Sequence, residues 1–182
     1  MMNKDTLKQD MSQFINLQNY IGLKLKLNGT EVVNCIPIAA SNDLLFVLRY
    51  QDFMPDGFEI LRLMDIQSYD YSDSCRYFEE IVKKEGAQSL LSDSSDINIS
   101  NWTTVFTSIK GLDDIVIVDI GKEDAVIVGR VASILEDSVR MHCFSPTGVW
   151  DDEEWAEPYK NITGIKFKNH YTNIYTKYLP AK

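Results

Sequence analysis

The sequence is poor in the residues from which most catalytic and metal-binding sites are built. It has only two histidines, His142 and His170, and three cysteines, Cys35, Cys75 and Cys143, and no CxxC or HxxxH pair. Acid-base or nucleophilic chemistry through histidine is therefore difficult to assemble. A zinc site would need ligands that are far apart in the sequence. We expect neither a metal ion nor a cofactor.

Phosphate-binding glycine loops and long apolar runs are also missing. The nine glycines are scattered and form neither a GxGxxG nor a GxxxxGK pattern. No apolar run approaches the roughly 20 residues of a membrane span, and the N-terminus lacks the apolar core of a signal peptide. An odd number of cysteines at unrelated spacings favours reduced thiols. We expect a cytoplasmic protein without a membrane partner.

His142 beside Cys143 raises the alternative of a reactive thiol-imidazole pair. Neighbouring residues in a strand point to opposite faces, so the two side chains would not meet. We expect a structural cysteine instead.

The composition is that of a globular protein with an acidic surface. Hydrophobic residues make up 45% and charged residues 25% of the 182 residues, and the net charge is −9. Such a surface repels phosphate backbones unless basic groups gather locally. The charge favours a protein partner over a nucleic acid.

The most informative positive feature is an internal duplication. Residues 66–78 and 162–174 occupy matching positions in two successive β-rich halves. The second stretch lies 96 positions after the first. This offset matches Ile66, Tyr69, Tyr71 and Phe78 with Ile162, Ile165, Phe167 and Ile174. Earlier in the chain an offset of 92 matches Phe14, Leu23, Leu25, Gly29 and Glu31 with Phe106, Ile115, Ile117, Gly121 and Glu123. The alternative is a chance alignment of two alternating β segments.

Each half is predicted to contain a leading helix, five strands and a closing helix. The first half has a helix after Asp5, strands at residues 23–27, 31–39, 44–50, 58–64 and 67–71, and a helix from Ser72 or Asp73. The second half has a helix capped by Ser100, strands at residues 114–120, 124–135, 138–144, 154–160 and 163–168, and a helix at residues 171–179. Pro37 restricts its strand to an edge or a bulge. We predict a mainly β, α+β fold with a first repeat at residues 1–91, an exposed linker at 92–100 and a second repeat at 101–182.

This element order resembles the Sm-like small barrel, here in tandem. Residues 25–38 and 60–69 are similar to the two halves of the Sm signature, and Gly129 stands where that family often has a glycine at the bend of its second strand. The resemblance implies two tandem five-stranded barrels, and an SH3-like barrel would leave nearly the same pattern. The residues with which the Sm family holds RNA bases are not reproduced by Asn42 and Asp43, by Arg62-Leu63 or by Tyr159-Lys160.

Two segments near the C-terminus are candidate binding surfaces. The acidic run at residues 151–154 is flanked by aromatic residues, and Trp150, Trp155 and Tyr159 are the candidate protein-binding residues. Residues 158–182 contain no Asp or Glu, and their lysines alternate with aromatic residues, a pattern that can bind nucleic acid. The candidate residues for that alternative are Lys160, Lys166, Lys168 and Lys177. Core packing of Tyr171, Ile174, Tyr175 and Tyr178 as an inward helical stripe would explain most of these aromatics without a ligand.

The sequence therefore favours a non-enzymatic protein-protein interaction module. It would act by strand addition at an open barrel edge or by burial of an aromatic patch, as in an acidic inhibitor or immunity-type partner of a basic enzyme. The alternative is an Sm-like RNA-binding protein. A third hypothesis is an enzyme that uses the carboxylates at residues 151–154, where a cation could also bind. The oligomeric state stays open.

Overall fold

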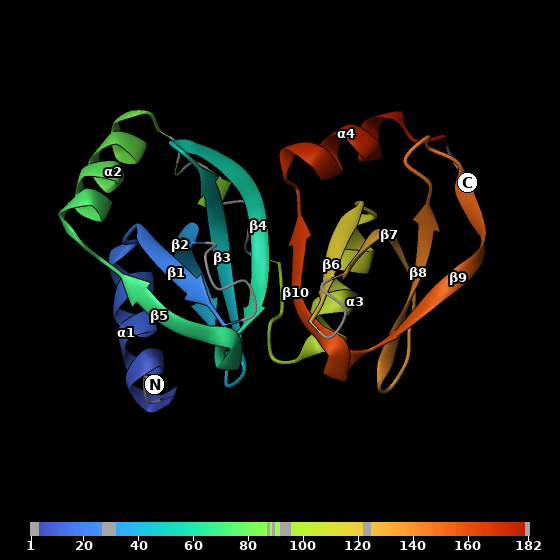
Figure 1. The fold of residues 1–182 in the computed structure, drawn as a ribbon, viewed down its shortest axis with the longest axis horizontal. Coiled ribbons are helices and arrows are strands. Elements are labelled where there is room, and N and C mark those ends of the chain that lie inside the picture. The colour runs from blue at the N-terminus through green and yellow to red at the C-terminus, as the bar shows by residue number, and fades with distance from the viewer. Residues whose placement is uncertain are drawn as a thin grey trace.

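The computed structural model describes residues 4–26, 32–86, 88, 90–91, 96–121 and 125–180. In this part of the chain, ten strands form one antiparallel sheet in the order β5-β1-β2-β3-β4-β10-β6-β7-β8-β9. Figure 1 shows two curved halves side by side, with β4 and β10 meeting in the middle. The mainly β, α+β class predicted from the sequence is confirmed.

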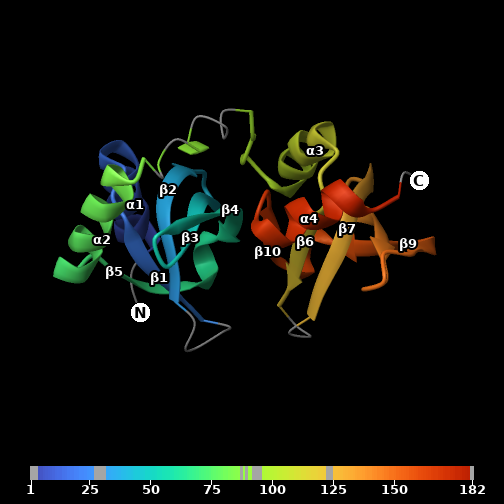
Figure 2. The ribbon, with the colours of Figure 1, turned by 90° about the horizontal axis from the view of Figure 1, so that it is seen from above.

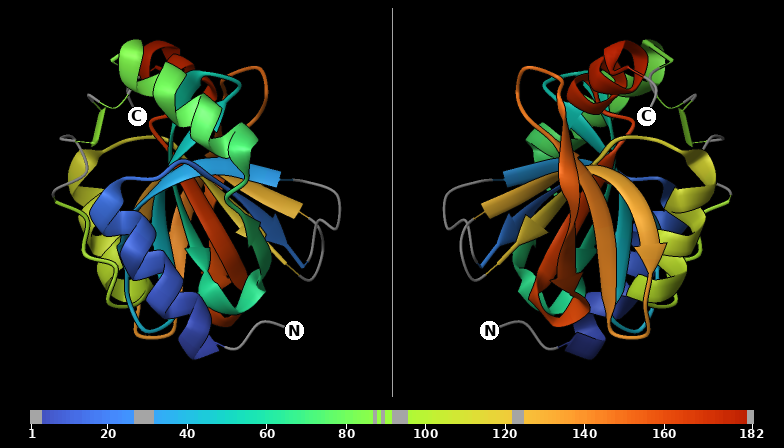
Figure 3. Two further views of the ribbon diagram at one scale, coloured as in Figure 1. Left: turned by 90° about the vertical axis from the view of Figure 1, so that its left-hand side faces the viewer. Right: turned by 90° about the vertical axis from the view of Figure 1, so that its right-hand side faces the viewer.

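The same succession of elements occurs in both halves. The first half consists of α1 (Lys4–Leu17), β1 (Ile21–Leu25), β2 (Val32–Ala40), β3 (Leu44–Gln51), β4 (Met54–Arg62), the 3-10 turn η1 (Leu63–Asp65), β5 (Ile66–Asp70) and α2 (Asp73–Lys84). The second half consists of α3 (Trp102–Leu112), β6 (Val116–Ile120), β7 (Ala125–Ile134), β8 (Ser138–Phe144), β9 (Trp150–Pro158), η3 (Tyr159–Asn161), β10 (Ile162–Phe167) and α4 (His170–Tyr178). Viewed along the long axis, α2 and α4 lie at the same end of their halves, and α1 and α3 lie on the same side (Figure 3).

Strand pairing repeats residue by residue. Tyr69 pairs with Leu23 on β1, and Ile165 pairs with Val118 on β6, as the offset of 96 requires. A bulge follows Pro37 in β2 and recurs after Val131 in β7. Pro37 therefore lies at a bulge, one of the places where a strand tolerates a proline.

The offset of 92 predicted for the first strand is wrong. Leu23 pairs with Val33, and its structural counterpart Val118 pairs with Ile127, so the offset between β1 and β6 is 95 rather than 92. Residues 115–118 and 120 are apolar on both faces, so Leu23 and Leu25 meet apolar residues at an offset of 92 as well as 95, and the sequence alone does not fix the register. The predicted match of Gly29 and Glu31 with Gly121 and Glu123 involves residues outside the described part of the chain.

Two separate five-stranded barrels are not what the chain forms. β4 and β10 pair antiparallel over four residues, so that one sheet runs through both halves. At this junction three phenylalanines pack together: the ring centroid of Phe167 lies 6.0 Å from that of Phe46 and 5.5 Å from that of Phe58. Aromatic contacts at these distances stabilise the fold beyond the contribution of the apolar area that they bury. They join the two halves into one unit.

Two apolar cores lie on the sheet. One lies in the first half and contains Leu7, Met11 and Phe14 of α1. The larger core spans both halves, and α3 packs into it through Val105, Phe106 and Ile109. Figure 2 shows α3 on one side of the sheet, beside β6 and β7. α3 starts at an Asn101-Thr104 capping box, so its N-cap is Asn101 rather than the predicted Ser100. Of the predicted linker, residues 92–95 lie outside the described residues, and Ile99 is buried.

Gly129 shows why its strand needs a glycine. A Cβ atom built there would lie 2.1 Å from the carbonyl oxygen of His142 on β8. The two backbones approach so closely that no other residue fits without a shift of the strands.

Candidate functional site

The edge strand β9 carries the acidic run of the sequence. The strand covers Trp150–Pro158, so it begins four residues before the predicted strand at 154, and residues 151–154 lie inside it. β9 pairs with β8, and no other described strand lies on its outer edge. Figure 1 shows it at the right-hand end of the molecule. The candidate site is therefore a sheet edge with unpaired backbone groups.

The carboxylates of β9 differ in how they are paired. Glu154 contacts His142 at 3.3 Å and Arg140 at 3.8 Å. Asp151, Asp152 and Glu153 are exposed, and no ion pair joins them to another described residue. These three form an acidic tip on an open strand.

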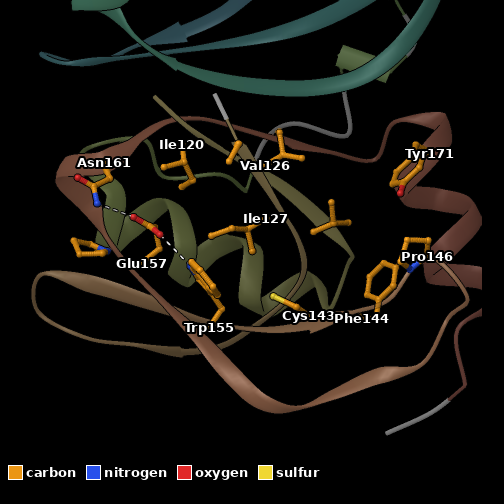
Figure 4. Close-up of a pocket in the computed structure, with 13 residues that line it drawn as sticks. Ile120, Val126, Ile127, Cys143, Phe144, Pro146, Trp155, Glu157, Asn161 and Tyr171 are labelled. Carbon is orange, nitrogen blue, oxygen red and sulfur yellow. Dashed lines mark hydrogen bonds between the residues drawn. The ribbon is translucent and has the colours of Figure 1, made fainter. Parts of the chain in front are cut away.

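A cavity of about 540 Å³ lies against the inner face of β9 (Figure 4). Its walls are mostly apolar and come from β6, β7, β8, β9, the segments after β8 and β9, and α4. Ile127, Cys143, Trp155 and Glu157 point into it in Figure 4. A volume of this size lies within the usual range for binding pockets.

Glu157 is the polar centre of this cavity. Its side chain is buried, and its two oxygens accept hydrogen bonds from Trp155 Nε1 at 3.0 Å and from Asn161 Nδ2 at 2.8 Å. Both donors are neutral, and within the described part of the chain no lysine or arginine forms an ion pair with Glu157. A buried carboxylate without a cation is costly, so the cavity favours a positively charged guest.

Cys143 and His142 lie on opposite faces of β8, as the sequence predicted. Cys143 lines the cavity, whereas His142 faces Glu154. Burial raises the pKa of the Cys143 thiol to about 11, so it stays protonated at neutral pH. The arrangement does not support thiolate chemistry.

The three aromatic candidates occupy different surroundings. Trp155 is 53% exposed and lines the cavity. Trp150 lies near the other end of β9, where Arg130 lies over its ring and Nε1 donates to the Pro180 carbonyl. Tyr159 stacks on Phe106 and donates to the Leu135 carbonyl. Trp155 alone of these three lines the cavity.

A second cavity of about 350 Å³ lies between the two halves and contains a charged cluster. Glu59 of β4, which is 1% exposed, accepts a hydrogen bond from Arg49 at 2.7 Å, and Lys166 of β10 lies 3.8 Å away. Lys166 also pairs with Asp119 at 2.9 Å. Here a lysine of the second half supplies positive charge to a carboxylate of the first.

The two cavities are equivalent within the repeat. Strand pairing and the 3-10 turns match the residues that line the second cavity, Leu25, Val33, Arg49, Glu59, Leu61 and Asp65, with Ile120, Ile127, Cys143, Trp155, Glu157 and Asn161 of the first. The first half closes its cavity with β10, whereas no described strand lies at the corresponding side of β9.

Burial raises the pKa of Glu59 to about 7, although Arg49 and Lys166 act in the opposite direction. The charged form of Glu59 is therefore held by its cations against a strong desolvation cost. This makes the junction between the halves sensitive to pH.

The four lysines proposed for nucleic-acid binding have different surroundings. Lys166 is occupied by Asp119 and Glu59. Lys160 is exposed in η3, Lys168 precedes α4 with a positive φ of 54°, and Lys177 lies over the ring of Tyr178. A phosphate backbone would have to compete with two carboxylates for Lys166.

The predicted inward stripe of α4 is wrong for three of its four residues, whereas Tyr175 is half-buried and its ring centroid lies 4.7 Å from that of Phe144. Tyr171, Ile174 and Tyr178 are exposed, and Thr172 is the buried residue of this helix. Thr172 forms a capping box with Asn169 that fixes the start of the helix. α4 lies across the end of the second half (Figure 1), so it presents most of its aromatics to solvent.

Of the charged residues that line the two cavities, sequence reasoning named Lys166 but missed Arg49, Glu59, Asp65, Asp119 and Glu157. One signal was present: Glu59 lies between Phe58 and Ile60 in the stretch from Phe58 to Leu61, which is otherwise apolar. A single acid in such a strand indicates a buried, partnered charge.

Groups that could hold a metal ion are not found among the described residues, and within the same ranges no helix has the length and apolar character needed to cross a membrane. Comparison of the chain with protein-family models, with curated proteins and with solved structures gives no match.

Proposed function

We propose that this chain is a protein-interaction module that binds an extended, basic segment of a partner by adding it as a strand to β9. The observation that carries the proposal is the combination of an open edge strand, an acidic tip and an adjoining cavity with a buried carboxylate. Strand addition satisfies the free backbone groups of the edge, and cavities beside the strand select side chains.

Charge supports a basic partner. The net charge is −9, and Asp151, Asp152 and Glu153 extend it to the strand edge itself. An acidic surface of this kind steers a basic protein toward it over a distance set by ionic strength. An inhibitor or immunity-type role against a basic enzyme belongs to the same class.

We also infer that each half is an open, strongly curved version of one Sm-like or SH3-like small barrel that was duplicated. The repeated strand pairing and the matching bulges after Pro37 and Val131 support this inference.

Removing the three charges of the acidic tip tests the proposed function. The probe is a fluorescein-labelled ten-residue peptide of alternating lysine and valine, with glutamate-valine and serine-valine peptides for comparison. We expect the triple variant Asp151→Asn, Asp152→Asn, Glu153→Gln to bind the lysine peptide about tenfold more weakly. Each exposed ion pair contributes about 0.2–1 kcal/mol, and tenfold corresponds to about 1.4 kcal/mol.

The matched control neutralises three exposed acids elsewhere, Glu80→Gln, Glu85→Gln and Glu136→Gln. Equal weakening by both triple variants would reduce the effect to net charge and contradict a site at β9. A gel shift of RNA that survives neutralisation of the tip would instead support the lysine-rich segment.

A further inference from the structure

The chain contains its own example of a strand added to an edge. β10 binds β4 antiparallel, with Phe167 opposite Phe58, Lys166 opposite Glu59, Ile165 opposite Ile60 and Gly164 opposite Leu61. Lys166 thereby reaches the cavity between the halves and meets Glu59. The junction shows which backbone register this type of edge accepts and which side chain enters its cavity.

The same register can be transferred to β9 through the repeat. The pairing of β9 with β8 matches that of β4 with β3, so Phe58, Glu59, Ile60 and Leu61 correspond to Glu154, Trp155, Ala156 and Glu157. A strand bound to β9 in this register would place its lysine opposite Trp155. Glu157 lies two residues further on the same face, a distance that long side chains span in a sheet.

We infer, as a consequence of the proposed function, that the partner strand binds β9 in the register in which β10 binds β4 and inserts one lysine or arginine between Trp155 and Glu157. The indole face of Trp155 is suited to a cation. Glu157 accepts hydrogen bonds from two neutral donors, so a cation would supply the charge that this carboxylate lacks.

A second copy of the chain does not meet this requirement. Its open edge at the other end of the sheet is β5, and the residue of β5 that corresponds to Lys166 is Asp70. Head-to-tail pairing of two copies would bring Asp70 to the acidic strand β9, where like charges oppose each other. The occupant is therefore a segment of a different protein.

The test uses a peptide with the sequence of residues 161–169, NITGIKFKN, blocked at both ends, together with its Lys166→Met form. Binding of both peptides is measured by calorimetry to the full-length wild type and to the Glu157→Gln variant. We expect Glu157→Gln to weaken the lysine peptide about tenfold and the methionine peptide less than twofold. The variant Trp155→Leu serves as a second probe of the cavity, with the same expected selectivity, and keeps the test decisive should Glu157→Gln unfold.

Equal weakening of both peptides would overturn the insertion of a lysine. Failure of the lysine peptide to bind, under conditions in which the alternating lysine-valine peptide binds β9, would overturn the register while leaving strand addition intact. If neither the 161–169 peptide nor the alternating lysine-valine peptide binds, both the proposed function and this inference are contradicted. Self-association through β9, seen by sedimentation, would also contradict the choice of occupant.

Discussion

The variant Arg49→Met is expected to lose about 3 kcal/mol of unfolding free energy at pH 8 and much less at pH 5. Removing one partner of a buried ion pair leaves an uncompensated charge, which typically costs about 3–5 kcal/mol. Here the uncompensated charge is Glu59, whose remaining cation Lys166 is 3.8 Å away and shared with Asp119. Chemical unfolding at the two pH values measures the difference.

The pH dependence follows from the raised pKa of Glu59. Its pKa is about 7 in the folded chain and has an ordinary value of 4.5, so the folded state binds more protons between these values. The unfolding free energy contributed by this group therefore falls as the pH rises from about 5 to about 7. At pH 5 Glu59 is largely neutral, so the loss of Arg49 leaves no unpaired carboxylate in the apolar interior.

The second half supplies a control for this prediction. It has Cys143 and Trp155 at the positions of Arg49 and Glu59, so the repeat tolerates an uncharged pair there. The double variant Arg49→Met, Glu59→Leu is expected to recover most of the lost stability, because replacing both ions removes the desolvation cost. An Arg49→Met variant that is equally destabilised at pH 5 and pH 8 would show that packing of the arginine, not its charge, matters.

Phe167→Ala is expected to destabilise both halves by about 3–4 kcal/mol, the usual cost of removing a buried phenylalanine ring. Phe167 belongs to the second half but packs against Phe46 and Phe58 of the first. If the sheet is one cooperative unit, hydrogen exchange should accelerate together in β2 and β3 and in β7 and β8.

Tyr178→Ala is the control for this change, since Tyr178 is 69% exposed and its loss should leave exchange unaltered. Faster exchange confined to the second half after Phe167→Ala would mean that the two halves unfold independently.

The repeat could be predicted from the sequence, but the pairing of β4 with β10 that joins its two copies could not. Alternating apolar residues located most strands, and the offset of 96 was confirmed because Tyr69 and Ile165 have equivalent pairing partners. The offset of the first strand was three residues too small, because residues 115–118 and 120 are apolar on both faces and match Leu23 and Leu25 in either register. The junction could not be predicted directly, since strand partners distant in sequence are chosen by tertiary packing.

β4 nevertheless gave an indication of its central place. Its residues Phe58 to Leu61 are apolar on both faces except for Glu59, and all four are buried. A strand that is covered on both faces typically has such a nearly continuous apolar sequence. The corresponding stretch of β9 replaces Phe58 and Leu61 with Glu154 and Glu157, which is consistent with a strand at the edge.

The candidate site was predicted in part. The acidic run and Trp155 were recognised from composition, but Glu157 gained its meaning only once Trp155 and Asn161 were seen to donate to it. An acidic edge can also serve to prevent aggregation, because charges on an edge strand discourage pairing between sheets. That function and partner binding differ in one observable, the behaviour of β9 in the presence of a basic strand.

The most direct measurement is backbone hydrogen exchange of residues 150–158 with and without the alternating lysine-valine peptide. Strand addition to β9 gives its outward-facing amides new hydrogen bonds, so we predict exchange at least tenfold slower there, with little change in β5 at the opposite edge. Unchanged exchange in β9 at saturating peptide, or protection found only elsewhere on the surface, would contradict the account.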